Sequence, residues 1–138
     1  MELSDEKYET IMESLEKGDS LAERGILKEA LKKYMEALDN IPNPKNDYEI
    51  ALHVYTALGD CYFNLKDFQN SCNNYNEALK CPDGLSHGYV WLGLGESYFE
   101  LQEIDKAQDA LMSAYMLEGK EIFNGEEDKY FDLIKQNI

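Results

Sequence analysis

The sequence predicts an all-α fold: a right-handed superhelical stack of three helical hairpins with a C-terminal capping helix, about seven helices in total. The first observation is a repeated run, which reads Tyr55-x-x-Leu58-Gly59-x-x-Tyr62 and, 36 residues later, Trp91-x-x-Leu94-Gly95-x-x-Tyr98. The second is that the offset continues, from Leu65, Phe68, Ser71, Tyr75 and Ala78 to Leu101, Ile104, Ala107, Leu111 and Ala114. This period indicates stacked hairpins, because one hairpin cannot bury its own apolar face.

The first hairpin is expected to start near Ser4. This N-cap residue is followed by Asp5 and Glu6, which favour the positive end of a helix dipole. A second helix is expected over about Leu27–Asn40. Pro42 ends it, because proline cannot continue the helical hydrogen-bond ladder.

Caps and turns place the remaining helices. Asn46 or Asp47 is expected to cap the third helix, which runs to about Lys66. The pattern then predicts helices over about Phe68–Lys80, Ser86–Leu101 and Ile104–Leu117. A helix over about 126–136 is expected to cover the open end of the stack with Tyr130, Phe131, Leu133 and Ile134.

Small residues recur where the helices of a hairpin must approach closely. Gly59 and Gly95 are expected at such contacts, where a larger side chain would force the helices apart. Cys61, Cys72 and Cys81 are odd in number and lack the spacing of a metal-binding pair. The sequence therefore predicts buried, reduced thiols with a packing role.

These residues together resemble the tetratricopeptide repeat, whose signature is an aromatic, Leu-Gly, an aromatic, then Ala, an aromatic, Ala and Pro. The resemblance divides a single domain, residues 1–138, into repeats at about 11–44, 52–85 and 88–121. The first repeat keeps Gly18 and the second half of the motif, in Ala30, Tyr34, Ala37, Leu38 and Pro42. The resemblance implies a non-catalytic scaffold that binds another protein.

The composition is strongly acidic. Thirteen basic against 28 acidic residues give a net charge of −15, which repels nucleic acid and anionic membranes and favours basic partners. Acidity that only keeps the protein in solution is the alternative. No segment approaches the roughly 20 apolar residues that span a bilayer, and the start of the chain lacks signal-peptide features. With the three thiols, these features predict a cytoplasmic protein.

Motifs that carry chemistry are missing from the sequence. It contains no Gly-rich phosphate loop, metalloprotease helix or nucleophile elbow. Neither His53 nor His87 has a Cys or Asp at a persuasive spacing. We therefore expect no enzyme activity, no metal and no cofactor. His53 is expected on a groove-facing helix, where contact with a partner and a plain surface role both remain open.

In the resembling family, the first helix of each hairpin lines a concave groove. The resemblance implies that the residue after each motif glycine faces this groove, namely Asp19, Asp60 and Glu96. Residues on the same helical faces complete the expected partner-binding groove: Glu23, His53, Thr56, Phe63, Asn64, Tyr89, Leu92, Phe99 and Glu100.

The expected groove alternates carboxylates with aromatic and aliphatic side chains. Neighbouring carboxylates raise one another's pKa, a cost that a cationic partner offsets. A metal is not expected between repeats roughly 10 Å apart, so a basic protein segment is predicted, with solvated acids as the alternative. The best-known peptide-binding subgroup grips a C-terminal carboxylate with Lys and Asn. Here Leu15, Asp19, Thr56 and Asp60 hold those places, which argues against that ligand.

Three functions compete. The leading hypothesis is an immunity protein that blocks a basic toxin, because residues 119–131 resemble the tail of small repeat proteins that accompany polymorphic toxins. The second is a chaperone of a secreted protein, similar to the acidic three-repeat chaperones of type III translocators. The third is a scaffold of another pathway. A monomer or weak homodimer is expected.

Overall fold

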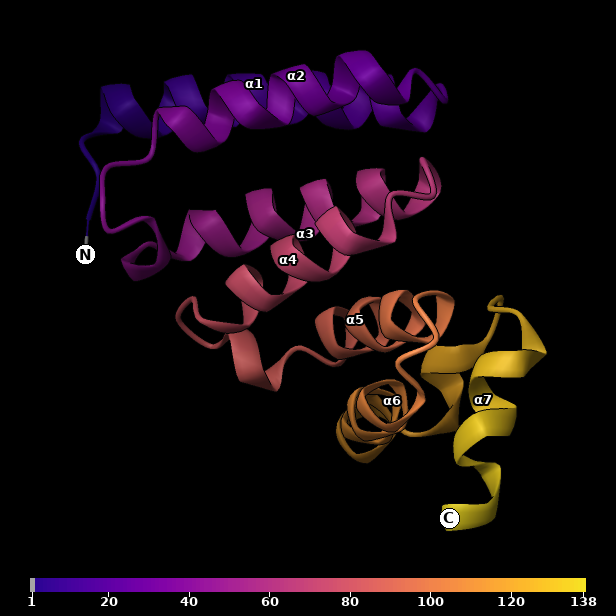
Figure 1. The fold of residues 1–138 in the computed structure, drawn as a ribbon. Coiled ribbons are helices and arrows are strands. Elements are labelled where there is room, and N and C mark those ends of the chain that lie inside the picture. Colours follow the sequence, from indigo (N-terminus) through magenta and orange to yellow (C-terminus); the bar gives the residue numbers. More distant parts are fainter. Residues whose placement is uncertain (1) are drawn as a thin grey trace.

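The computed structural model describes residues 2–138 and shows a stack of helical hairpins (Figure 1). The seven α-helices of this described part are α1 (Asp5–Glu23), α2 (Leu27–Asp39), α3 (Glu49–Asn64), α4 (Phe68–Leu79), α5 (Gly88–Glu100), α6 (Ile104–Glu118) and α7 (Asp128–Ile134). Residues 2–138 contain no strand. Consecutive helices pair as α1–α2, α3–α4 and α5–α6, while α2 packs on α3 and α4 packs on α5. The predicted all-α stack of three hairpins with a C-terminal capping helix is confirmed.

The helix starts agree with the sequence in the first hairpin and differ in the second. Ser4 caps α1, since its hydroxyl accepts a hydrogen bond from the Lys7 amide at 3.2 Å. The prediction that Asn46 or Asp47 caps α3 is wrong, because these residues lie in a 3₁₀ turn, η1 (Lys45–Asp47), and α3 starts two residues later. The Asn46 amide instead donates to the Glu77 carbonyl at 2.9 Å, which ties the connection to α4.

Close helix contacts at the motif glycines are confirmed. A Cβ atom on Gly59 would lie 2.7 Å from the Tyr75 ring, and one on Gly95 would lie 2.6 Å from the Leu111 side chain. The first hairpin repeats this arrangement, with Gly18 against the ring of Tyr34. Each hairpin therefore sets one large side chain of its second helix against a glycine of its first.

The C-terminal cap is shorter than the predicted 126–136. A 3₁₀ turn, η3 (Lys120–Phe123), leads into the two-turn helix α7, and a second 3₁₀ turn, η4 (Lys135–Asn137), follows. Phe123, Tyr130 and Ile134 are buried with Leu92 and Leu111 in a cluster that covers the third hairpin. No helix in residues 2–138 is both long and apolar enough to cross a membrane. Burial of all three cysteines is also confirmed.

Candidate partner-binding groove

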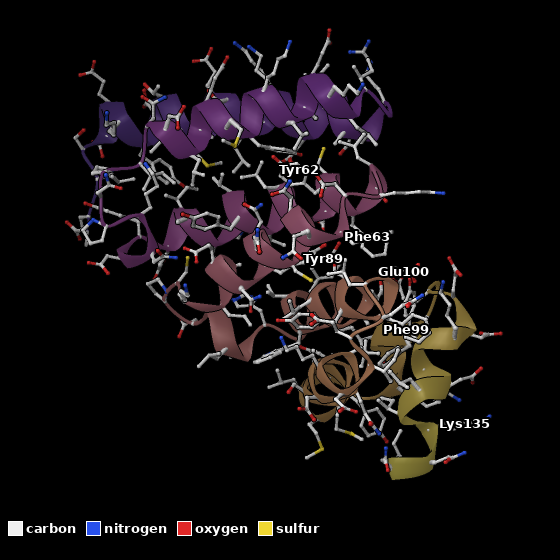
Figure 2. All side chains as sticks on the ribbon, in the orientation of Figure 1. Tyr62, Phe63, Tyr89, Phe99, Glu100 and Lys135 are labelled. Atoms are coloured by element: carbon white, nitrogen blue, oxygen red, sulfur yellow. The ribbon has the colours of Figure 1, made fainter. Side chains whose placement is uncertain are left out.

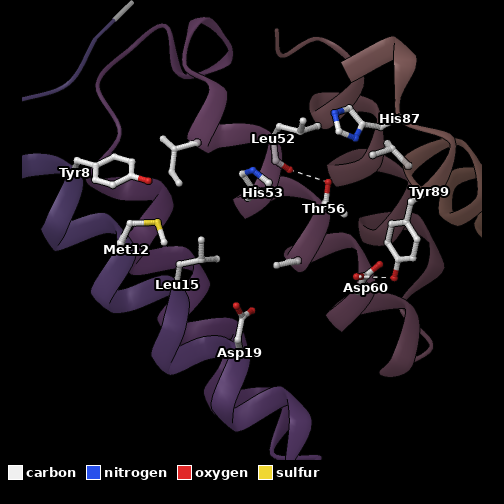
Figure 3. A pocket seen from close by; sticks show the side chains of 13 residues that line it. Tyr8, Met12, Leu15, Asp19, Leu52, His53, Thr56, Asp60, His87 and Tyr89 are labelled. Atoms are coloured by element: carbon white, nitrogen blue, oxygen red, sulfur yellow. Dashed lines mark hydrogen bonds between the residues drawn. The ribbon is translucent and has the colours of Figure 1, made fainter. Parts of the chain in front are cut away.

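The first helices of the three hairpins enclose two adjoining cavities. The first, about 460 Å³, lies between α1 and α3, with Tyr89 reaching in from α5 (Figure 3). It is lined by Tyr8, Met12, Leu15, Asp19, Ile50, Leu52, His53, Thr56, Ala57, Asp60, His87, Tyr89 and Val90. The second, about 220 Å³, is lined by Asp60, Phe63, Asn64, Tyr75, Tyr89, Leu92, Gly93, Glu96 and Glu126. Asp60 and Tyr89 belong to both cavities, so we treat the two as one groove.

Most of the predicted groove residues lie together in this groove. The first cavity contains Asp19, His53, Thr56, Asp60 and Tyr89. The second contains Asp60, Phe63, Asn64, Tyr89, Leu92 and Glu96. Glu23, Phe99 and Glu100 line neither cavity. Contact of these residues with a partner stays a prediction.

Phe99 and Glu100 are occupied by the C-terminal cap. The Phe99 ring packs edge-on against Tyr130, with ring centroids 5.3 Å apart. The Glu100 carboxylate pairs with the Lys129 ammonium at 2.9 Å and accepts a hydrogen bond from the Tyr130 hydroxyl at 2.8 Å. Burial alone would raise the pKa of Glu100, but Lys129 and Tyr130 outweigh it, so the pKa lies below its usual value. Figure 2 labels Phe99 and Glu100 near α7.

Tyrosine hydroxyls satisfy the groove carboxylates of the first two hairpins. The Tyr34 hydroxyl donates to Asp19 Oδ1 at 2.7 Å. At the corresponding place in the second hairpin, the Tyr75 hydroxyl donates to Asp60 Oδ1, and the Tyr89 hydroxyl donates to Asp60 Oδ2 at 3.0 Å. In both hairpins the tyrosine of the second helix follows its aspartate by 15 residues.

Burial raises the pKa of Asp60 to about 6, although the hydrogen bonds from Tyr75 and Tyr89 act in the opposite direction. The nearby charges of Glu126 and Asp19 add to the increase. Asp60 is therefore a carboxyl group that can hold or release a proton close to neutral pH.

Glu96, the groove carboxylate of the third hairpin, has no such partner. Its side chain is only 6% exposed, and none of the described residues forms a hydrogen bond with its Oε2 atom. Burial and the adjacent Glu126 carboxyl raise the pKa of Glu96 well above its usual range, and Asp60 and Glu100 contribute further. A buried acid of this kind favours a bound proton or a neighbouring cation.

Sequence reasoning missed Glu126 and Tyr75, which line the second cavity, and Tyr34, whose hydroxyl binds the groove residue Asp19. Glu126 was expected inside the capping helix, but it lies in the turn before α7 and lines the second cavity. The tyrosines had a usable signal, because the same spacing of 15 residues from groove aspartate to tyrosine occurs in two repeats. No sequence signal fixed the position of Glu126, since it depends on how η3 turns the chain.

The groove combines acidic, hydroxyl and aromatic side chains. Within residues 2–138, no group of His, Cys, Asp and Glu side chains has an arrangement that could hold a metal ion. His53 is exposed on α3. The groove therefore offers carboxylates, tyrosine hydroxyls and aromatic faces, which together suit a cationic ligand.

Comparison with known families fits this architecture. One tetratricopeptide-repeat family profile matches residues 52–80, and a second matches residues 89–114. The chain is a tetratricopeptide-repeat protein. Tetratricopeptide repeats are non-catalytic modules of protein–protein interaction, and this chain is such a module. No protein with a curated description gives a significant match to the sequence.

Solved tetratricopeptide domains share the fold. The C-terminal TPR-containing domain of a Plasmodium falciparum protein assigned as FK506-binding superposes with a TM-score of 0.77 at 19% identity, over 98% of this chain and 90% of that domain. The first TPR domain of human RPAP3 gives 0.72 at 23% identity, over 92% and 94%. The first TPR of Spaghetti (RPAP3), bound to the HSP90 peptide SRMEEVD, gives 0.70 at 20% identity, over 93% and 92%.

Proposed function

We propose that the groove of this tetratricopeptide-repeat protein binds a basic segment of a protein partner. The observation that carries the proposal is the uncompensated acidity of the groove. Asp60 and Glu96 are held in or beside the second cavity with Glu126, and no described Lys or Arg forms an ion pair with any of the three. A cationic ligand would remove the cost of keeping these carboxyl groups close together.

Aromatic side chains supply the second part of the surface. Tyr89 is 54% exposed while its hydroxyl stays on Asp60. Phe63 is half-buried beside it in the second cavity, and both are labelled in Figure 2. Tyrosine and phenylalanine at the rim of a charged cavity provide contact area that governs how long a complex lasts.

The same charges weigh against an acidic peptide ligand. The Spaghetti domain is bound to a peptide that ends in Glu-Glu-Val-Asp. In this chain, the groove is lined by Asp19, Asp60 and Glu96, and the net charge is −15. Repulsion between like charges would oppose such a tail, so we propose a partner of the opposite sign.

We propose neutralisation of a basic bacterial toxin as the first biological setting to test. Its support is the resemblance of residues 119–131 to the tail of immunity-type repeat proteins, together with the acidic groove. A chaperone of a secreted protein that binds an extended basic segment is the alternative, supported by the length of the groove across three hairpins. In either setting we propose a cytoplasmic monomer or weak homodimer, and genes neighbouring the coding sequence would separate the two.

The test begins with a pull-down from the native host, which identifies a stoichiometric partner by mass spectrometry. Association is then measured with the purified partner for the double variants Asp60→Lys/Glu96→Lys and Phe63→Ala/Tyr89→Ala, with Glu29→Lys on α2 as the control. Circular dichroism first confirms that each variant folds. We expect the charge reversal mainly to slow association, the aromatic truncation mainly to speed release, and the control to bind like the parent.

Rising salt should weaken parent binding, because charges are screened over about 8 Å at physiological ionic strength. Parent-like binding by both double variants would show that the groove is not the site. The convex face or α7 would then be the next surface to test.

A further inference from the structure

We infer that the cavity bounded by Asp60, Glu96 and Glu126 is a socket for the guanidinium group of one arginine side chain of the partner. The inference rests on the proposed function, since it specifies which group of a basic segment enters the groove. The three carboxyl groups come from α3, α5 and the turn before α7, so they approach one space from separate walls. At about 220 Å³, the cavity exceeds the volume of several water molecules, each about 30 Å³ in the liquid.

Glu96 lines the socket, and its buried Oε2 atom has no hydrogen-bond partner among the described residues. The first two hairpins satisfy the corresponding carboxylates with Tyr34 and Tyr75, 15 residues further along the chain. The residue 15 places after Glu96 is Leu111, whose side chain packs against Gly95 and carries no donor. The third hairpin therefore keeps the packing of the repeat and leaves out its hydroxyl, so the Glu96 carboxyl lacks the tyrosine donor of the other two hairpins.

The neighbouring end of the stack shows how this protein accommodates a cation. There the Lys129 ammonium lies 2.9 Å from the Glu100 carboxylate and within 5.5 Å of the centroids of the Phe99 and Tyr130 rings. The socket contains the same chemical groups, carboxylates with Phe63 and Tyr89, but no cation from the described residues. A carboxylate with aromatic neighbours is the preferred surroundings of a lysine or arginine head.

The number and placement of the carboxyl groups favour arginine over lysine. A guanidinium group carries five N–H donors in one plane, so it can donate to carboxylates on different walls and stack on a ring at the same time. A lysine ammonium is a compact point charge without a planar set of donors, so it cannot stack on a ring in the same way. The protein uses lysine in a more exposed setting, where the Lys129 ammonium lies 2.9 Å from Glu100 and 3.5 Å from the exposed Glu127.

Without the partner, a proton takes the place of the cation between Glu96 and Glu126. The titratable groups that face this pair are Asp60 from α3, Tyr75 from α4, Tyr89 and Glu100 from α5, and Tyr130 from α7. The acids among them disfavour ionisation, so arginine entry must displace a proton. Affinity should therefore increase as the pH rises through about 6, where Asp60 loses its proton, and continue to increase towards the pKa of Glu96, about 10. Binding near neutral pH should release protons to the buffer.

The test is an NMR titration of the full ¹⁵N-labelled chain with N-acetyl-L-arginine amide at pH 7.5. We expect saturable shifts confined to amides around Asp60, Tyr89, Glu96 and Glu126. N-acetyl-L-citrulline amide, which is neutral and nearly the same shape, should leave these amides unchanged, and N-acetyl-L-lysine amide should bind more weakly. Glu96→Gln and Glu126→Gln should each weaken arginine binding about tenfold or more, because each removes a charged acceptor.

Glu29→Gln removes the same charge from an exposed position on α2 and should bind like the parent. Calorimetry in two buffers of different ionisation enthalpy should detect proton release, which a merely structural role of Glu96 would not produce. Equal binding of the citrulline probe, or parent-like binding by both glutamine variants, would overturn the socket. Equal affinity for the lysine probe would overturn the choice of arginine.

The two proposals can fail separately. If the identified partner loses affinity with Asp60→Lys/Glu96→Lys while the arginine probe fails to bind, the groove is the partner site and the socket is wrong. If the probe binds as expected while the partner tolerates every groove variant, the socket is real and the proposed function is wrong.

Discussion

The second and third hairpins each place a carboxylate at the same position of the groove, but the hydrogen-bond donors around it differ. In the second, Asp60 receives hydroxyl hydrogen bonds from Tyr75 and Tyr89. In the third, Glu96 is more deeply buried, and its Oε2 atom has no hydrogen-bond partner among the described residues. The repeat explains the difference, because the tyrosine of the second hairpin is replaced by Leu111 in the third.

This contrast separates what a repeat needs for folding from what it can vary. Glycine against a large side chain occurs in both hairpins, through Gly59 with Tyr75 and Gly95 with Leu111. The phenolic hydroxyl is not part of that packing, since leucine fills the equivalent place without it. A substitution can therefore leave the stack intact and still leave an acid unsatisfied, which is how a uniform scaffold acquires a distinct binding position.

The largest expected effect tests whether Gly95 of the third hairpin occupies the position that Gly59 occupies in the second. Gly95→Leu should lower the free energy of unfolding by about 3 kcal/mol or more, because the added side chain would overlap both the side chain and the backbone nitrogen of Leu111. Urea denaturation measures the loss. Asn73→Leu, an exposed substitution on α4, is the control for added apolar bulk. An unchanged unfolding midpoint for Gly95→Leu would mean that the register is misassigned.

The next effect concerns the hydroxyl that the third hairpin lacks. Tyr75→Phe should cost about 1.5–3 kcal/mol, since it removes a hydrogen bond from a buried hydroxyl to a partly buried charged group. Tyr34→Phe is the matched variant in the first hairpin and should cost less, because Asp19 is exposed to water. Urea denaturation compares the two variants.

The pH dependence of the Tyr75 variant has a defined sign. The lost hydrogen bond favours the ionised carboxyl, so its removal should raise the pKa of Asp60 above about 6. The stability difference from the parent should be largest above that pH and should shrink in acid. Carboxyl NMR titration of Asp60 gives the pKa. An equal loss of unfolding free energy in Tyr34→Phe and Tyr75→Phe would show that the burial of the carboxylate does not determine the strength of this hydrogen bond.

The sequence predicted the parts of this molecule that repetition determines. The close contacts at Gly59 and Gly95 follow from a 36-residue offset, and the structure confirms both. The groove positions of Asp60 and Glu96 follow from the resemblance to the tetratricopeptide repeat. The C-terminal end has no second copy for comparison, so the turn that brings Glu126 into the groove could not be read from a pattern.

The same limit explains why the contacts of Phe99 and Glu100 were not predicted. Helical geometry correctly places both residues on the first helix of the third hairpin. Their occupation by Tyr130 and Lys129 depends on tertiary packing of a two-turn helix that sequence spacing does not specify. The start of α3 is a local case of the same kind. Asn46 has the chemistry of an N-cap, but its amide binds a carbonyl on the neighbouring helix instead.

Glu96→Gln should stabilise the protein at neutral and alkaline pH, by about 1–2 kcal/mol, because a neutral amide can be buried without taking up a proton on folding. The pKa of Glu96 is higher in the folded than in the unfolded chain, so the folded state holds a proton that the unfolded state has released. Parent stability must therefore decrease as the pH rises above 4.5, the ordinary value for this acid.

The gain from Glu96→Gln should accordingly be absent near pH 4 and clear at pH 8. Thermal unfolding across this range provides the measurement, and Glu29→Gln should show no comparable gain. Destabilisation by Glu96→Gln at pH 8 would imply that the ionised carboxylate is the stabilising form, and the contrast between Asp60 and Glu96 would then be wrong.

The smallest effect is expected at the occupied end of the groove. Lys129→Ala removes the ammonium paired with Glu100, and only a slight decrease in stability should follow because the pair is partly exposed and screened by water. The informative readout is binding, since Glu100 and the Phe99 ring would then lack their cation. In the NMR titration with N-acetyl-L-lysine amide, shifts should extend to the amides of Phe99 and Glu100, with affinity increased by up to about fivefold. Lys135→Ala removes an equal charge from η4, labelled in Figure 2, and should leave those amides unchanged. Equal responses of the two variants would show that net charge alone, and not release of Glu100, controls cation binding at this end.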